Sequence, residues 1–263
     1  MNCLPRVNAA PPADWSDFVK ELDRWALAGR VAEFWWRDDD AVTATPQLRT
    51  LLSLAGDNPL SLAVIPASAE PSLAEAVAGS LDLTVLLHGW RHANHAAPGE
   101  KKSEYPAGRP AVDVAAELAE GIDGLRRLFA PRFQPILVPP WNRIAPEFLP
   151  LLPELGIAAV SIIARPQAPL LSGELAATDV HVDFVAWRTT RGFIGTDVAL
   201  AALIGKLQAG RLTPKDYNTV TGILTHHLVM DAAAEAFLER LVPMVAAHPA
   251  AQWVGAEALL RRR

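Results

Sequence analysis

The sequence predicts an α/β protein built on a parallel sheet. Short β-branched runs alternate with longer helical patterns along the 263 residues. Hydrophobic residues make up 51% of the chain and charged residues 20%, so there is enough apolar material for a packed core. Because α/β barrels of this length commonly form one unit, we expect residues 1–263 to be a single domain.

A helical extension within residues 1–30 opens the chain. Apolar side chains recur there at helical spacing and form one face; they are Trp15, Phe18, Val19, Leu22 and Trp25. We expect this face to pack against the core rather than to bind a ligand.

Seven segments then have the composition of strands. They are residues 31–37, 60–65, 82–88, 135–138, 157–162, 180–186 and 220–226. Helical patterns separate most of them, and the clearest cover 111–129 and 231–247. The second of these begins at Asp231, which we expect to be its N-cap.

One long irregular stretch, 89–110, is rich in glycine and proline and begins at a pair of histidines. Loops of this length in compact domains are usually functional or disordered. We expect either a plain solvated loop or a segment that closes over a substrate. In the second case the contacts would come from Lys101, Lys102, Glu104 and Tyr105.

Charge and cysteine content exclude several classes of function. The net charge is -5, from 24 basic and 29 acidic residues, which gives no basic field for a phosphate backbone, so we expect no nucleic acid partner. Cys3 is the single cysteine and cannot form an internal disulfide.

The chain has no run of about 20 apolar residues, and its first residues lack an apolar leader core. We therefore expect a cytoplasmic protein without membrane contact, and the sequence leaves its oligomeric state open.

Polar side chains accumulate where the apolar strand runs stop. In chain order they are Arg37 to Asp40, His88 and His92, Trp141 and Asn142, Asp183, and His226 and His227. The carboxyl ends of parallel strands meet at one edge of a sheet or barrel, where active sites form. We expect these side chains to lie together at that edge.

The acidic triplet Asp38, Asp39 and Asp40 cannot stay fully ionised in a buried strand end without compensation, because each carboxylate is desolvated and repels its neighbours. An isolated triplet of this kind is more often a solvated turn or a cap paired with Arg37. A histidine pair nearby reverses that preference and favours a bound cation.

The histidine pair follows the third strand. Gly89 lets the chain turn after His88 and bring His92 back alongside. Two imidazoles and one carboxylate would make a three-ligand metal site with an open position, as in catalytic metal sites. The helical histidine pair of metalloproteases requires a glutamate directly after the first histidine, and Gly89 stands there, so a protease is disfavoured.

At the seventh strand, His226 ends an apolar run, and Asp183 and Trp187 lie on a neighbouring element. A histidine oriented by a carboxylate and shielded by an aromatic ring is suited to general acid catalysis, although a core histidine is the alternative. His227 points the opposite way along the strand and is expected to be structural. Trp141 is equally compatible with a core position and with a sugar-stacking face.

Together these residues resemble the polysaccharide deacetylases, the fourth family of carbohydrate esterases. The order of motifs matches over nearly the whole chain. The family's Asp-Asp motif is similar to Asp39 and Asp40, its His-x-x-x-His motif to His88–His92, its proline-rich third motif to Val138–Asn142, its Asp and Trp motif to Asp183 and Trp187, and its Leu-x-His motif to Leu224–His226. The resemblance implies a distorted (β/α)7 barrel, which agrees with the independent count of strand candidates.

The resemblance also implies roles. Asp39 would be the general base and His226 the general acid, while Asp183 would hold the second ring nitrogen of His226. Zinc or a similar divalent ion would be held by Asp40, His88 and His92. The expected substrate contacts are Trp141, Asn142, Arg143 and Trp187. The activity implied is removal of an acetyl or other acyl group from an N- or O-acetylated, carbohydrate-like small molecule or oligosaccharide.

Three points stay open at this stage. The register of the triplet also allows Asp38 as the base and Asp39 as the ligand. Val138 replaces the arginine that usually pairs with the catalytic aspartate, and we expect Arg37 or Arg143 to substitute. Gly89 replaces a usual serine or threonine. The alternatives are a catalytically silent carbohydrate-binding barrel and a metal-dependent hydrolase of another amide or ester.

Overall fold

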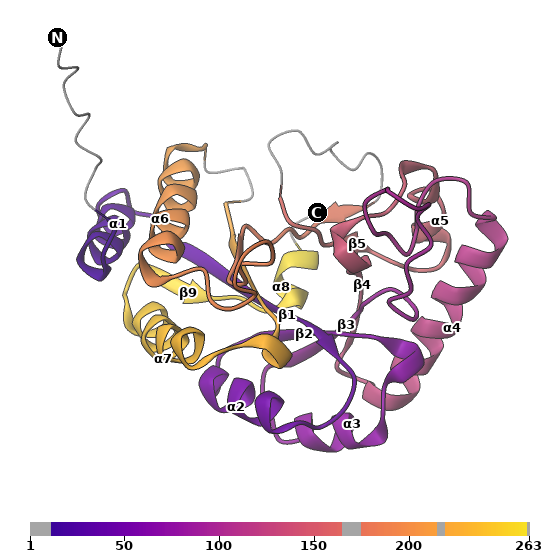
Figure 1. Cartoon of the computed structure of the whole chain (residues 1–263). Coiled ribbons are helices and arrows are strands. Elements are labelled where there is room, and N and C mark those ends of the chain that lie inside the picture. The colour runs from indigo at the N-terminus through magenta and orange to yellow at the C-terminus, as the bar shows by residue number, and fades with distance from the viewer. Residues whose placement is uncertain (1–11, 165–174, 215–218, 262–263) are drawn as a thin grey trace, which may run out of the picture.

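The computed structural model describes residues 12–164, 175–214 and 219–261, and shows a curled parallel sheet surrounded by helices (Figure 1). The strands are β1 (Ala32–Ala41), β2 (Leu60–Val64), β3 (Leu83–Leu87), β4 (Phe133–Leu137), β5 (Ala159–Val160), β6 (Ala176–Ala177), β7 (Val182–Asp183), β8 (Thr221–Thr225) and β9 (Ala251–Trp253). Their order is β6-β5-β4-β3-β2-β1-β8-β7, with β9 beside β1, and every pairing is parallel. All seven predicted strands are present, whereas β6 and β9 were not predicted.

One segment closes the sheet on itself. The edge strands β6 and β7 both belong to residues 176–183. Val180 forms a parallel bridge with Ile163, just beyond β5, and the N–H of the next residue, His181, donates to the carbonyl of Gly222 on β8 at 2.7 Å. If this segment is taken as one strand, the sheet is the predicted distorted seven-stranded barrel, with β9 as an addition beside β1.

The helices lie mainly outside the sheet. They are α1 (Trp15–Leu27), α2 (Pro46–Ala55), α3 (Pro71–Val77), α4 (Ala111–Phe129), α5 (Leu151–Glu154), α6 (Thr196–Leu212), α7 (Ala232–Ala247) and α8 (Ala256–Leu260). The predicted helix at 111–129 is confirmed by α4, and Asp231 caps α7 by accepting the N–H of Ala234 at 2.9 Å. The predicted N-terminal helix is α1, whose Trp25 indole donates to the carbonyl of Leu207 on α6 at 3.2 Å. None of the described helices is long and apolar enough to cross a membrane.

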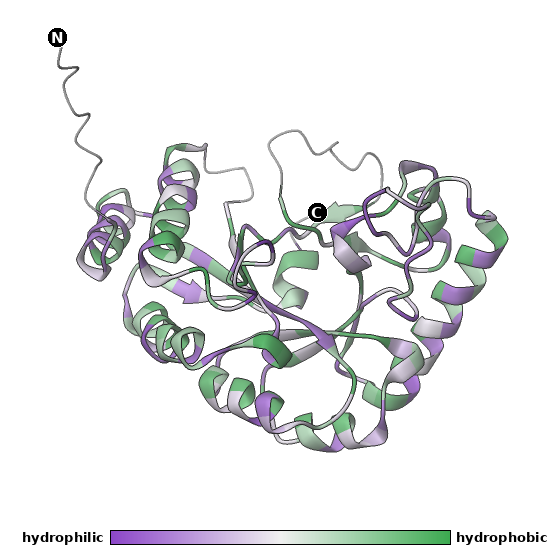
Figure 2. Cartoon of the chain, viewed as in Figure 1, coloured by the Kyte–Doolittle hydropathy of each residue, from purple (hydrophilic) through white to green (hydrophobic). Residues whose placement is uncertain are grey.

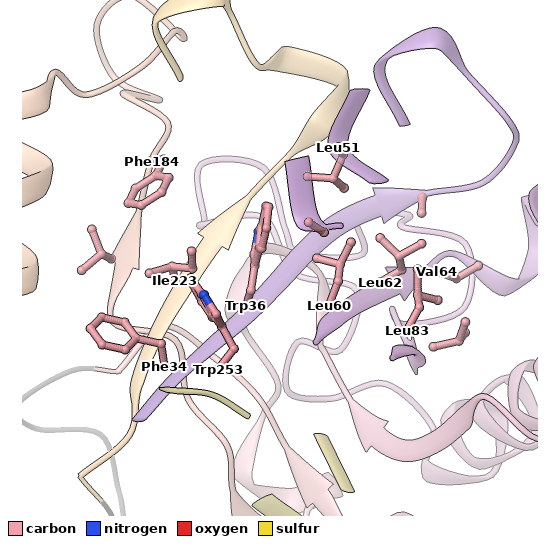
Figure 3. Packing of buried hydrophobic residues seen from close by; sticks show 14 of the residues in the cluster. Phe34, Trp36, Leu51, Leu60, Leu62, Val64, Leu83, Phe184, Ile223 and Trp253 are labelled. Atoms are coloured by element: carbon pink, nitrogen blue, oxygen red, sulfur yellow. The ribbon is translucent and has the colours of Figure 1, made fainter. Parts of the chain in front are cut away.

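The sheet has two apolar faces. The outer face packs against the helices, and Figure 3 shows part of this layer, including Phe34, Trp36, Ile223 and Trp253. Figure 2 shows hydrophobic and hydrophilic residues alternating along the surrounding helices, and hydrophilic residues on part of the long strand β1. A smaller cluster fills the inside of the barrel, where Trp35 packs with residues of several strands and with Leu259 of α8.

Alternation along β1 therefore decides which side of the barrel each residue faces. Phe34 and Trp36 belong to the outer cluster, and Trp35 belongs to the inner one. Continuing the alternation puts Arg37 and Asp39 on the inner face, with Asp38 on the outer face.

Candidate functional site

The candidate metal ligands meet where β1 and β3 end. A carboxylate oxygen of Asp40 lies 3.0 Å from Nε2 of His88 and 3.4 Å from Nε2 of His92. One ligand atom from each of the three residues lies within 4.8 Å of the others. The structure thus brings together the three residues that the sequence predicted as a metal site.

A second contact orients His88. Its Nδ1 lies 2.9 Å from the carbonyl oxygen of Val138, so the ring donates its proton there and turns Nε2 towards Asp40. Histidine ligands of metals usually make such a hydrogen bond with the other ring nitrogen. Val138 therefore contributes its backbone carbonyl to the site and its side chain to the inner core. It is the residue that replaces the arginine expected from the family resemblance.

The charges in this cluster are coupled. Burial would raise the pKa of Asp40, but the hydrogen bond with His88 and the nearby histidines bring that pKa well below its ordinary value. Burial would lower the pKa of His88, yet the hydrogen bond to Asp40 and the charge of Asp39 raise it. Burial and the neighbouring His88 lower the pKa of His92. A cation coordinated by Nε2 of His88 would compete with a proton at that nitrogen, so its affinity would depend on pH.

The backbone around these residues is unusual. Among the described residues, five that are not glycine have a positive φ, and four of them are in this region: Asp40 (72°), His92 (55°), Trp141 (54°) and Asn142 (56°). Each such conformation costs on the order of 1–3 kcal/mol and persists only where the surrounding structure imposes it. Clustered strain of this kind is typical of functional sites.

Arg37 is the guanidinium that holds Asp39. It is fully buried, and its Nε and Nη2 donate to the two oxygens of Asp39 at 2.8 Å and 3.0 Å. It also donates to the hydroxyl of Ser161 at 2.6 Å and to the side-chain oxygen of Asn142 at 3.0 Å. Of the two arginines that we expected to replace the missing one, Arg37 lies within hydrogen-bond reach of Asp39, whereas Arg143 donates to the carbonyl of Lys102.

Asp38 has a different set of partners on the outer face. Its carboxylate accepts hydrogen bonds from the hydroxyl of Thr225 at 2.6 Å and from the N–H of His227 at 2.9 Å, and it also pairs with the His227 ring. Burial would lower the pKa of His227, but Asp38 raises it. These contacts hold the Asp38 carboxylate against β8 and His227, whereas Arg37 holds the Asp39 carboxylate on the inner side.

His226 and Asp183 do not form the hydrogen bond that we expected. The carboxylate of Asp183 accepts the N–H of Val185 at 3.0 Å and the indole N–H of Trp187 at 2.8 Å. The Trp187 ring meets His226 edge-on at 4.8 Å, and Nδ1 of His226 is buried without a partner among the described residues. Asp183 therefore contacts His226 through the Trp187 ring and not by a hydrogen bond of its own; burial raises the pKa of Asp183.

Aromatic rings flank the site on two sides. The Trp141 ring lies 4.3 Å from that of His92, and Nζ of Lys102 lies 5.9 Å from the centre of the Trp141 ring. Trp187 is 39% exposed on the side of His226. Both rings are accessible for contact with a substrate, whereas Asn142 is tied to Arg37.

The loop 89–110 follows the prediction in being irregular, but two of its expected substrate contacts are wrong. Lys101 and Lys102 are exposed. Glu104 and Tyr105 are buried, with 1% and 0% of their surface exposed, so neither faces a substrate. The carboxylate of Glu104 instead binds backbone N–H groups of the same loop. Sequence reasoning also missed Ser161, for which no sequence signal exists.

A cavity of about 170 Å³ lies elsewhere, beside α8. Its lining includes Trp35, Asp179, His181 and Leu259, and none of the candidate ligands. Nδ1 of His181 accepts the N–H of Gly222 at 2.9 Å, and burial together with the charge of Lys206 lowers the pKa of His181 to about 3. This cavity is separate from the candidate site.

Comparison with solved structures identifies the type of fold. No family model matches the chain, and no curated protein matches it. Solved structures do match. A Mycobacterium smegmatis protein assigned to the polysaccharide deacetylases is 18% identical with a TM-score of 0.64, over 97% of this chain and 93% of that one.

Two further structures are similar. The Bc1960 peptidoglycan N-acetylglucosamine deacetylase is 15% identical with a TM-score of 0.55, over 89% of this chain and 90% of that one. A family 4 acetyl xylan esterase from Clostridium thermocellum, solved with a cobalt ion, is 12% identical with a TM-score of 0.51, over 87% of this chain and 90% of that one. These likenesses show that the chain has the fold of the polysaccharide deacetylases, with a divergent sequence.

Proposed function

We propose that this protein is a metal-dependent deacetylase that removes an acetyl or related acyl group from an N- or O-acetylated carbohydrate. One observation carries the proposal. The ligand set of Asp40, His88 and His92 lies at the strand ends of a deacetylase-type barrel, directly beside an aspartate that Arg37 holds in place.

The residues fit a divalent ion, zinc or one with similar preferences. Two imidazole nitrogens and a carboxylate oxygen suit such ions, and a three-residue set leaves a coordination position open for substrate or water. The carbonyl of Val138 orients His88 for this role. When bound, the ion supplies Lewis acidity that polarises an acyl carbonyl and acidifies water.

Asp39 acts as the general base in this proposal. It sits next to Asp40 in the chain, and its charge raises the pKa of His88, so it lies within electrostatic range of the ligand set. The paired contacts from Arg37 hold it in one orientation. Asp39 takes a proton from the attacking water as the water oxygen bonds to the acyl carbon.

His226 acts as the general acid. Its charge lowers the pKa of Asp40, which puts the ring near the ligand set, on the side where Trp187 lies. His226 donates its proton to the amine or hydroxyl that leaves as the bond to the acyl carbon breaks. Asp183 fixes the Trp187 ring and, through it, the position of His226.

The side chains that we propose to contact the substrate are those near the catalytic residues that solvent can reach. Trp141 packs against His92 and Trp187 against His226, and the aromatic surface of both rings suits the apolar face of a sugar ring. Arg143 is held beside Trp141 through its bond to the Lys102 carbonyl and contributes a polar contact. Asn142 contributes by linking this segment to Arg37.

The test measures acetate release and metal content together. The full chain is stripped of metal and assayed on N-acetylated and O-acetylated sugars with zinc, with cobalt and with neither, and metal is counted by elemental analysis. We expect about one ion per chain and metal-dependent release. His88→Ala and His92→Ala should lose both, while His95→Ala, a change at an exposed histidine of the same loop, should keep both.

Two results would contradict the proposal, and they differ. Bound metal without release from any acetylated substrate would indicate a silent carbohydrate-binding barrel or a hydrolase of another amide or ester. Unchanged metal content in both His88→Ala and His92→Ala would show that the ion binds elsewhere.

A further inference from the structure

The loop that carries His92 is held from within by one buried carboxylate. Glu104 is 1% exposed. Its Oε2 accepts the N–H of Trp90 at 3.0 Å, and its Oε1 accepts those of Arg91 at 2.8 Å and Ala93 at 3.2 Å. These backbone donors lie in a segment without regular secondary structure, so the carboxylate replaces the partners that a helix or strand would provide.

The three donors lie on both sides of His92 in the chain. One anion bound to residues before and after His92 constrains the short arc between them. Successive backbone N–H groups around one anion form a concave nest of this kind. His92 itself has a φ of 55°, a conformation that needs such external support.

Gly89 makes room for this carboxylate. A Cβ at position 89 would lie 2.0 Å from Oε2 of Glu104 and 2.7 Å from two ring carbons of Pro140. The φ of Gly89 is +60°, which also disfavours a side chain. The absence of a side chain at 89 and the presence of a carboxylate at 104 are therefore two parts of the same packing arrangement.

The backbone of Glu104 is connected to helix α4 through Arg109. Its backbone carbonyl accepts a hydrogen bond from Arg109 at 3.1 Å, and Arg109 forms a two-pronged pair with Glu117 on α4 at 2.9 Å and 2.8 Å. A continuous series of contacts thus runs from a long helix to the segment around His92.

We propose that Glu104 is a positioning residue that preforms the site of His92 before an ion binds. The inference rests on the proposed metal site, and it assigns to Glu104 a role that does not involve contact with substrate or metal. Residues that orient metal ligands typically contribute about 10- to 100-fold to metal affinity. We expect an effect of that size from Glu104.

The experiment compares Glu104→Gln and Glu104→Ala with the wild-type full chain. Zinc affinity is measured on metal-free protein by competition with a chromophoric chelator, and hydrogen exchange is followed at the amides of Trp90, Arg91 and Ala93. We expect affinity to fall about 10- to 100-fold, more for alanine than for glutamine, and these amides to exchange faster. The matched control is Glu100→Gln, since Glu100 is exposed in the same loop and accepts a single N–H, from Ala97 at 3.2 Å.

Gly89→Ala provides a second route to the same test. The added methyl group would meet both the Glu104 carboxylate and Pro140, so zinc affinity should fall with Glu104 still present. Faster exchange of the Trp90, Arg91 and Ala93 amides in this variant would show that the carboxylate has left them. Wild-type affinity and wild-type exchange in both Glu104 variants would overturn the inference. If the wild type binds no zinc, the proposed function fails instead, and the exchange data still decide whether Glu104 holds the loop.

Discussion

Removing the Arg37 guanidinium should damage both stability and activity. Arg37 is fully buried and makes four hydrogen bonds, to Asp39, Ser161 and Asn142. Asp39 is itself only 2% exposed, so Arg37→Met leaves a buried carboxylate without its cation. Breaking a buried pair by removing one partner costs about 3–5 kcal/mol, a large share of the roughly 5–15 kcal/mol that stabilises a typical domain.

The activity loss follows from geometry. The same guanidinium holds both Asp39 and Asn142, so Arg37→Met frees the proposed base and the segment that carries Trp141. Displacement of a catalytic group by about 1 Å commonly costs on the order of 10²-fold in rate. We therefore expect kcat to fall by at least about that factor.

Urea unfolding followed by circular dichroism, together with the acetate-release assay, measures both effects. The double variant Arg37→Met/Asp39→Leu replaces the whole pair with apolar groups, so it should be more stable than Arg37→Met alone while remaining inactive. Arg49→Met, at an exposed arginine on α2 that the proposal does not use, is the control, and it should change the free energy of unfolding by no more than about 0.5 kcal/mol. The reasoning would be refuted if Arg37→Met were as stable and as active as Arg49→Met.

Three further predictions concern the triplet, the acid and a distant histidine. Asp39→Asn should lose turnover and keep its metal, whereas Asp40→Asn should lose metal in elemental analysis; the reverse pattern would exchange their roles. His226→Ala should lower turnover by about 10²- to 10⁴-fold with metal retained, and a substrate whose leaving group needs no proton should be affected much less; equal losses would make His226 structural. The pKa of His181 is lowered from 6.5 to about 3, so the folded state binds fewer protons than the unfolded state between those values, and stability is lost as pH falls through that window. His181→Gln should flatten the acid side of the unfolding profile, whose slope from this group is at most about 1.4 kcal/mol per pH unit, and parallel profiles would contradict the assignment.

Local periodicity was enough to predict most of the elements. The boundaries of α4 and the cap of α7 at Asp231 depend on spacing and on side chains near in sequence, so they could be read directly. The strands β6 and β9, with two and three residues, lie in segments without a β-branched run, whereas the equally short β5 and β7 lie within the longer apolar segments 157–162 and 180–186. Both β6 and β9 form because neighbouring strands offer hydrogen-bonding partners, which is a property of the folded sheet.

The candidate metal set was also predictable, since Asp40 lies near the end of β1 and His88 and His92 follow β3, and the carboxyl ends of these strands must converge in a parallel barrel. The sequence could not decide the separate roles of the adjacent carboxylates Asp38 and Asp39. Successive strand residues face opposite sides, so a shift of one residue exchanges the partners of Asp38 and Asp39.

By itself, then, the sequence determined the barrel, its strand ends and the candidate ligand residues, because these depend on patterns repeated along the chain. Tertiary structure alone decided that Arg37 holds Asp39, that Asp183 reaches His226 only through Trp187, and that Glu104 fills the space left by Gly89. Gly89 and Glu104 lie more than ten positions apart in the chain, and the contact between Asp183 and His226 is indirect. Such contacts are set by packing and burial, which leave no periodic signal in the sequence.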